Sequence, residues 1–161
     1  MITVRTATPA DAAELVRLRA LMFEAMSGAA APGEWEATAE TVLRERLAAP
    51  PQELTMPAFV VDDPGRPGRL AACAVGTLEQ RLPAPGHPDG LFGFVFNICT
   101  DPGHRRRGYA RACTAALLEW FDARRATRID LHATEGAEPL YRDLGFHEHS
   151  IPLSRTKLLR Q

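Results

Sequence analysis

Apolar residues in the first third of the chain recur at the spacing of a helix. The repeat consists of Leu15, Leu18, Met22 and Met26. This spacing places the apolar side chains on one helical face, so we predict a helix over residues 12–26, preceded by a short strand over 2–6. A second helix is expected over residues 38–49, where Pro50 and Pro51 end it.

The apolar pattern changes to a period of two after residue 57, which indicates strands. Residues 58–62 and 70–78 are expected to form a hairpin, because the segment between them, 63–68, has the composition of a turn. Residues 91–100 contain the apolar run FGFVFNIC, which is too short for a typical buried helix and is rich in aromatic and β-branched side chains. This segment is the predicted central strand.

The last third of the chain is expected to alternate helices with strands. The predicted elements are a helix over 107–124, a strand over 129–133, a short helix over 139–144 and two short strands, one near His147 and one over 155–159. Gly145 lies where a left-handed helix cap is expected, and Phe146 can supply the hydrophobic contact of that cap. This order predicts an α/β (α+β) fold with a mixed sheet of six or seven strands and about four helices, in one domain over residues 1–161.

Composition and charge argue against several classes of protein. The chain has 161 residues, of which 45% are hydrophobic and 24% charged, as in globular domains. A net charge of −1 provides no overall field for nucleic acid or for an anionic membrane. The three cysteines lack C-x-x-C spacing, which argues against a disulfide framework or a zinc knuckle. Without a signal-like or membrane-spanning apolar segment, we expect a cytoplasmic protein.

The segment 97–110, with the sequence NICTDPGHRRRGYA, carries the most specific chemical signal. A strand end is followed by a Pro-Gly turn, three arginines, a glycine and a helix start. The start of a helix offers unpaired backbone N–H groups and the positive end of a dipole, so it binds anions. Gly108 lets a phosphate approach the backbone, and the guanidinium groups match phosphate oxygens. Taken alone, the same residues also suit a solvated arginine cluster that opens an ordinary helix.

Two blocks of this sequence resemble the signatures of the GNAT superfamily of N-acetyltransferases. The first is Arg105-x-x-Gly108-x-Ala110, which is similar to that family's acetyl-CoA motif. The second is the segment 139–146, PLYRDLGF, which is similar to its Leu-Tyr helix ending in Leu-Gly-Phe. The resemblance implies a mostly antiparallel sheet with a central parallel pair of strands that splay apart to admit acetyl-CoA as co-substrate, with no metal. Dimerisation is frequent in that family, so a homodimer stays open.

The resemblance also assigns residues to the co-substrate. The backbone from residue 105 to 110 would hold the pyrophosphate of coenzyme A, and the exposed strand edge would hydrogen-bond its pantetheine arm. The residues of the pyrophosphate site are Arg105, Arg106, Arg107, Gly108, Tyr109 and Ala110, and those of the strand edge are Ile98, Cys99 and Thr100. An amine would then attack the thioester directly, without a covalent enzyme intermediate.

Tyr141 stands at the position of the residue that protonates the departing thiolate in that family, a role that suits a phenol. Two positions depart from the family pattern. Thr134 stands where an asparagine often binds the cofactor arm, and the central strand lacks the acidic residue that sometimes serves as base. Glu79, His87 or a chain of water molecules stay open as the base.

The implied function is therefore a transferase, an acetyl-CoA-dependent N-acetyltransferase acting on a primary amine of a small molecule or a protein. A non-catalytic acyl-CoA sensor on the same fold is the alternative, and the donor could carry a longer acyl group. Minor hypotheses are a nucleophilic Cys99 and a metal site at His147 and His149. Trp35 is expected in a loop, as a wall of the acceptor pocket or as an anchor of that loop.

Overall fold

The structure is a computed structural model that describes residues 1–134 and 136–159. Its sheet has the strand order β1-β2-β3-β4-β5. The strands are β1 (Arg5–Thr6), β2 (Ala58–Asp62), β3 (Leu70–Gln80), β4 (Leu91–Thr100) and β5 (Arg128–Leu131). The helices are α1 (Ala12–Ser27), α2 (Glu34–Leu47), α3 (Tyr109–Ala123) and α4 (Glu138–Asp143). All neighbouring strands are antiparallel except β4 and β5, which are parallel. The predicted mixed α/β fold is thus confirmed.

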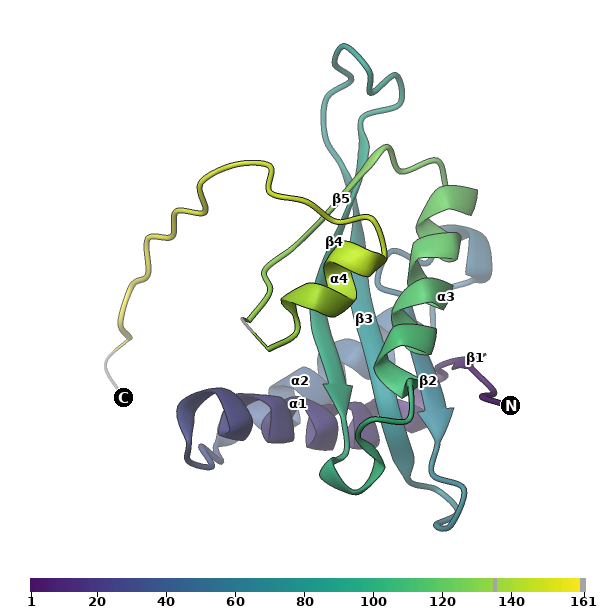
Figure 1. Cartoon of the computed structure of the whole chain (residues 1–161), viewed down its shortest axis with the longest axis vertical. Coiled ribbons are helices and arrows are strands. Elements are labelled where there is room, and N and C mark those ends of the chain that lie inside the picture. The colour runs from purple at the N-terminus through teal and green to yellow at the C-terminus, as the bar shows by residue number, and fades with distance from the viewer. Residues whose placement is uncertain (135, 160–161) are drawn as a thin grey trace.

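Two hydrophobic cores hold helices on opposite faces of the sheet (Figure 1). One core joins α1 and α2 to the face that carries Cys73 and Cys99, and the other joins α3 to the opposite face. Phe121 of α3 is fully buried against β3 and β4. A Cβ atom on Gly93 would lie 2.9 Å from its ring, so β4 needs glycine for this close approach.

Helix α2 begins at Glu34, four residues before the predicted start at residue 38. The backbone N–H of Gly33 donates to the Glu36 carboxylate at 3.2 Å, which stabilises the first turn. Trp35 therefore lies in a helix and not in a loop. Among the described residues, no helix is both long and apolar enough to cross a membrane.

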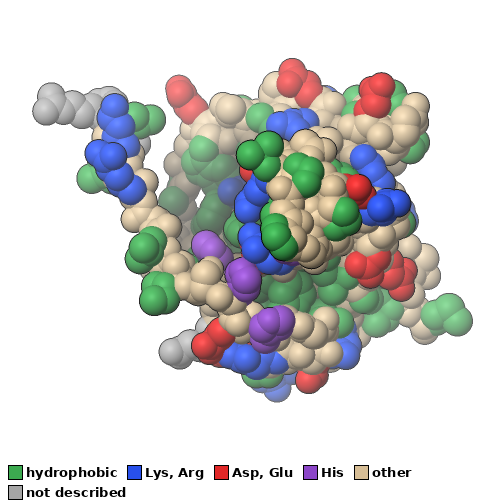
Figure 2. Space-filling model, turned by 90° about the horizontal axis from the view of Figure 1, so that it is seen from above, with side chains coloured by type: hydrophobic (Ala, Val, Ile, Leu, Met, Phe, Trp, Pro, Cys, Tyr) green, Lys and Arg blue, Asp and Glu red, His purple; other side chains and the backbone are tan. Residues whose placement is uncertain are grey.

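The prediction of six or seven strands was wrong, because the described part of the chain contains five. The two strands expected near His147 and over 155–159 are absent from the described C-terminal segment, which follows an irregular path away from the other elements (Figures 1 and 2). Ile151 and Leu158 are 83% and 91% exposed, so these side chains bury little of their surface on the described part of the chain. Alternating apolar residues form a strand only where a neighbouring strand pairs with them. The parallel pair consequently lies at an edge of the sheet and not at its centre.

A register shift in β4 shapes the region beside this pair. Val75 pairs with Asn97 and the next residue, Gly76, pairs with Val95, so Phe96 is an extra residue that forms a β-bulge. Strand β5 pairs only with residues 92–95 of β4. Beyond the bulge, residues 97–100 of β4 pair with β3 on one side and have no strand on the other within the described chain.

Candidate active site

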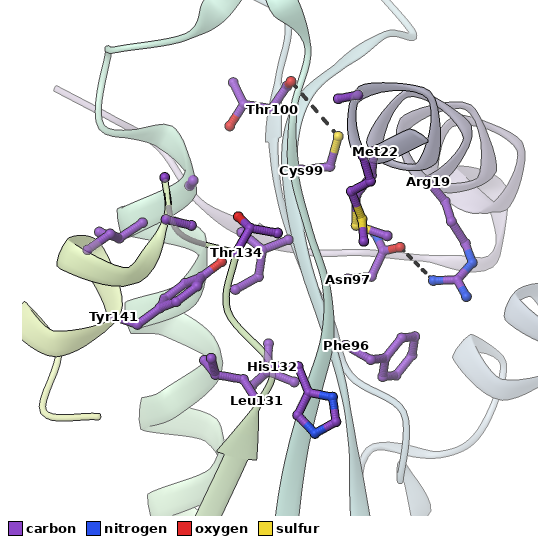
Figure 3. A pocket seen from close by; sticks show the side chains of 18 of the residues that line it. Arg19, Met22, Phe96, Asn97, Cys99, Thr100, Leu131, His132, Thr134 and Tyr141 are labelled. Carbon is purple, nitrogen blue, oxygen red and sulfur yellow. Dashed lines mark hydrogen bonds between the residues drawn. The ribbon is translucent and has the colours of Figure 1, made fainter. Parts of the chain in front are cut away.

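A cavity of about 810 Å³ opens where β4 loses its parallel neighbour. Its wall is formed by the free edge of β4, by α1 on one side and by α4 with the segment after β5 on the other (Figure 3). Arg105 and Ala110 bring the start of α3 to the same cavity. The arrangement can receive an extended ligand along the strand edge, with one end at the start of α3.

The turn before α3 presents a series of backbone donors. Within the described residues, the N–H groups from 105 to 111 have no hydrogen-bond acceptor in the protein. Gly108 is the residue before the helix and has a φ of +80°, and Arg106 also has a left-handed backbone, with a φ of +62°. Such a turn points successive N–H groups in one direction and, together with the helix dipole, forms a site for an anion.

The base of this turn is tied to α1 and β3 by ion pairs. Asp101 accepts a hydrogen bond from the backbone N–H of Gly103 at 3.0 Å and from Arg17 at 2.7 Å. Arg17 also binds Glu14, which in turn accepts from the backbone N–H of Leu70. Burial favours a higher pKa of Asp101, but the bonds from Arg17 and Gly103 lower it overall, so this carboxylate stays ionised.

The structure brings most of the sequence-predicted residues together at this cavity. Those that line it are Ile98, Cys99, Thr100, Arg105, Ala110 and Tyr141. Those that lie in the adjoining turn and first helical residue, outside the cavity lining, are Arg106, Arg107, Gly108 and Tyr109. Arg107 contacts His104 at 3.2 Å, so its side chain is engaged within the turn.

Tyr141 reaches the cavity from α4 and is held there by the end of that helix (Figure 3). Gly145 has a φ of +97°, and the N–H of Phe146 donates to the Tyr141 carbonyl at 3.1 Å, which forms the predicted left-handed cap. The rings of Tyr141 and Phe146 pack edge to face. Tyr141 is only 9% exposed, and burial raises the pKa of its phenol, which is therefore protonated at neutral pH.

Thr134 also lines the cavity, at the position where the sequence departs from the expected asparagine. Its carbonyl oxygen accepts hydrogen bonds from the N–H groups of Ala137 and Glu138, both at 3.1 Å. The backbone of Thr134 therefore supports the start of α4, while its side chain stands beside Tyr141 (Figure 3).

The side chains considered as bases in the sequence lie elsewhere. Glu79 pairs with Arg81 at 3.0 Å, and His87 contacts the Thr127 hydroxyl at 2.6 Å; neither lines the cavity. His132 does line it and packs edge to face on Phe94, with 5.5 Å between ring centroids. In the sequence, His132 lies between the apolar residues Leu131 and Ala133, and this alternation alone indicates only the wetter side of a strand.

The minor hypotheses also have structural outcomes. Burial raises the pKa of the Cys99 thiol to about 11, so only about one molecule in ten thousand carries the thiolate at pH 7. His149 contacts Arg128 at 3.1 Å. No group of three or more His, Cys, Asp or Glu side chains comes together as a metal site in the described ranges. Trp35 donates to the Ala31 carbonyl and packs against Phe23, so it anchors a wall of the cavity without lining it.

Sequence reasoning missed two polar residues of the cavity, Arg19 and Asn97. Arg19 donates to the side-chain oxygen of Asn97 at 2.8 Å, and Asn97 is 2% exposed. Two features of the sequence could have pointed to these residues. Arg19 is a charged residue directly after the apolar Leu18, and Asn97 is a single polar residue inside an apolar strand. Neither signal indicates that α1 and β4 place these two side chains together.

Known proteins resemble the chain in sequence and in structure. Residues 17–146 match the family described as the acetyltransferase (GNAT) family. A protein described as a predicted acetyltransferase from Clostridium acetobutylicum, crystallised with acetyl-CoA, is 20% identical, with a TM-score of 0.80 over 97% of this chain and 96% of its own. A GCN5-related N-acetyltransferase from Ralstonia eutropha JMP134 is 25% identical, with a TM-score of 0.71 over 95% and 99%. Glucosamine-6-phosphate N-acetyltransferase from Arabidopsis thaliana is 13% identical, with a TM-score of 0.75 over 97% and 98%. No curated protein matches the chain.

Proposed function

Because the chain belongs to the acetyltransferase (GNAT) family, we propose that it transfers an acetyl group from acetyl-CoA to a primary amine by direct attack. One observation carries this proposal. A free strand edge and a buried phenol face the same cavity, and a turn with free backbone donors adjoins it, with Arg105 and Ala110 in the cavity lining.

The described residues fit two hydrogen-bonding parts of coenzyme A, its pyrophosphate and its pantetheine arm. The N–H groups from 105 to 111 would hold the pyrophosphate, and Arg105 adds a positive charge beside them. The pantetheine arm contains amides, and the unpaired edge of β4 over residues 96–100 offers it backbone partners in the manner of an added strand. This arrangement would direct the thioester toward Tyr141.

The proposed reaction exchanges one acyl bond for another. The amine nitrogen forms a bond to the thioester carbonyl carbon, the carbon–sulfur bond breaks, and the sulfur keeps the bonding electrons. Tyr141 would donate its proton to that sulfur, and the nitrogen would release its surplus proton to water in the cavity. The raised pKa of Tyr141 supports this role, because the phenol stays protonated until the thiolate forms.

The test measures binding and turnover separately. Calorimetry with coenzyme A and acetyl-CoA gives affinity, and release of free thiol over a panel of amines gives turnover. We expect micromolar-range binding and thiol release that depends on an amine. Binding without turnover on any amine would favour the acyl-CoA sensor, and absence of binding would overturn both functions.

A further inference from the structure

Among the described residues, the guanidinium group of Arg19 has no carboxylate partner. Its neighbours in the N-terminal layer are neutralised: Arg5 binds Asp11 and Asp62, and Arg17 binds Glu14 and Asp101. For Arg19, no Asp or Glu of the described chain lies within ion-pair distance, although its side chain is partly buried. A partly buried cation without a counter-ion is unfavourable unless a ligand supplies the opposite charge.

The guanidinium of Arg19 is held in a fixed position. It lies over the ring of Phe23 at 4.7 Å and near that of Phe96 at 5.8 Å, measured to the ring centroids. One of its terminal nitrogens donates to Asn97, which is itself fixed by burial and by a contact to the Cys73 sulfur at 3.4 Å. The stacked, planar group still has N–H donors for a ligand, and its fixed orientation lowers the entropic cost of binding one.

The electrostatic character of the cavity supports the same conclusion. Its charged or titratable wall includes Arg19, Arg105 and His132, and none of the described lining residues is Asp or Glu. Arg105 lies beside the turn assigned to the pyrophosphate, whereas Arg19 enters from α1, across β4 from Tyr141 (Figure 3). Arg19 is thus available for a second ligand, and the described lining offers a polycationic amine no carboxylate.

We propose that the acceptor is an amine that also carries a carboxylate or a phosphate, and that Arg19 binds this anionic group. The proposal rests on the acetyltransferase function proposed above. A guanidinium recognises both anions through paired, charge-assisted hydrogen bonds. The β-bulge contributes directly, because it places Phe96 beside Arg19 on the α1 side of the sheet.

The experiment compares amines in matched pairs, in the full chain with saturating acetyl-CoA. The carboxylate arm uses β-alanine and β-alaninamide, and the phosphate arm uses O-phosphoethanolamine with ethanolamine and glucosamine 6-phosphate with glucosamine. Spermidine serves as the polycation. The variants are Arg19→Met, which keeps the apolar stem, and Arg19→Lys, which keeps the charge without the planar fork. Arg44→Met removes an exposed arginine from α2 and is the matched control.

For each pair, kcat/KM of the anionic amine is divided by kcat/KM of the neutral amine. The deciding quantity is this ratio in the unmodified protein divided by the same ratio in Arg19→Met. This double ratio cancels the intrinsic reactivity of each amine. In at least one arm we expect about tenfold or more, the usual worth of a hydrogen bond to a charged group. Arg44→Met should leave the ratio unchanged, and all variants should bind coenzyme A as the unmodified protein does.

Equal use of both members of every pair, or a preference for spermidine, would overturn the proposal while leaving the acetyltransferase function intact. If coenzyme A binds and no amine reacts, the proposed acetyltransferase function fails. Calorimetric titration of the anionic amines into the coenzyme A complex then tests whether Arg19 binds an anion. Binding that disappears in Arg19→Met supports the anion site, and absence of binding overturns it.

Discussion

Replacement of Gly108 by alanine tests the turn that is proposed to hold the pyrophosphate of the co-substrate. Gly108 has a φ of +80°, a conformation that costs a residue with a side chain roughly 1–2 kcal/mol. The new Cβ atom would meet only the Cδ1 atom of Ile2 at 3.5 Å, an ordinary contact, so the cost comes from the backbone. For a chain of 161 residues this lowers Tm by about 2–8 °C.

Gly103→Ala is the matched control, because Gly103 lies in the same loop without a left-handed backbone, and its Cβ atom would meet the Asp101 carboxylate at 3.5 Å. The difference in Tm between the two variants isolates the backbone cost at Gly108. A methyl group at the proposed anion site should also lower the affinity for acetyl-CoA about tenfold or more, which calorimetry measures. Equal Tm values would refute the conformational argument. Equal affinities in a destabilised Gly108→Ala would show that the turn does not hold the pyrophosphate.

Three further substitutions test the site and the packing beneath it. Tyr141→Phe should lower kcat by about 10²-fold or more with little change in acetyl-CoA affinity. In the unmodified enzyme, any loss of activity through phenol ionisation should begin at a higher pH than for an ordinary tyrosine, because burial raises this pKa. Full activity of Tyr141→Phe in the thiol-release assay would remove the phenol from the mechanism. Cys99→Ala should turn over as fast as the unmodified protein, because burial keeps the Cys99 thiol protonated and therefore unreactive; in the unmodified protein this thiol should resist alkylation at pH 8. A Cys99→Ala variant that folds and binds acetyl-CoA but is inactive would contradict this. Gly93→Ala should destabilise the fold by about 1–3 kcal/mol in urea unfolding, because its Cβ atom would lie 2.9 Å from the ring of Phe121; unchanged stability would mean that α3 moves away at no cost.

Periodicity predicted the elements whose own residues bury one face. Helix α3 and strands β2, β3 and β4 lie where the apolar spacing indicated, because each packs its repeat on a core. The same reasoning failed for residues 155–159. Their alternation has no neighbouring strand in the described structure, and a strand is stable only with a pairing partner.

The turn that is proposed to bind the pyrophosphate could also be expected from local sequence. A strand end, Gly108 and the start of α3 are adjacent along the chain, so their geometry depends on a few backbone dihedrals. The cavity beside it could not be expected in this way. Its walls come from α1, β4 and α4, which are far apart in sequence.

The sequence by itself therefore determined the order of most elements, the glycine turn before α3 and the position of Tyr141 in a short helix. Only the tertiary structure decided the bulge at Phe96, the early end of β5 and the meeting of Arg19 with Asn97. The physical reason is that apolar spacing reports which face of an element is buried. Strand register and contacts between distant elements depend on the packing of the whole chain.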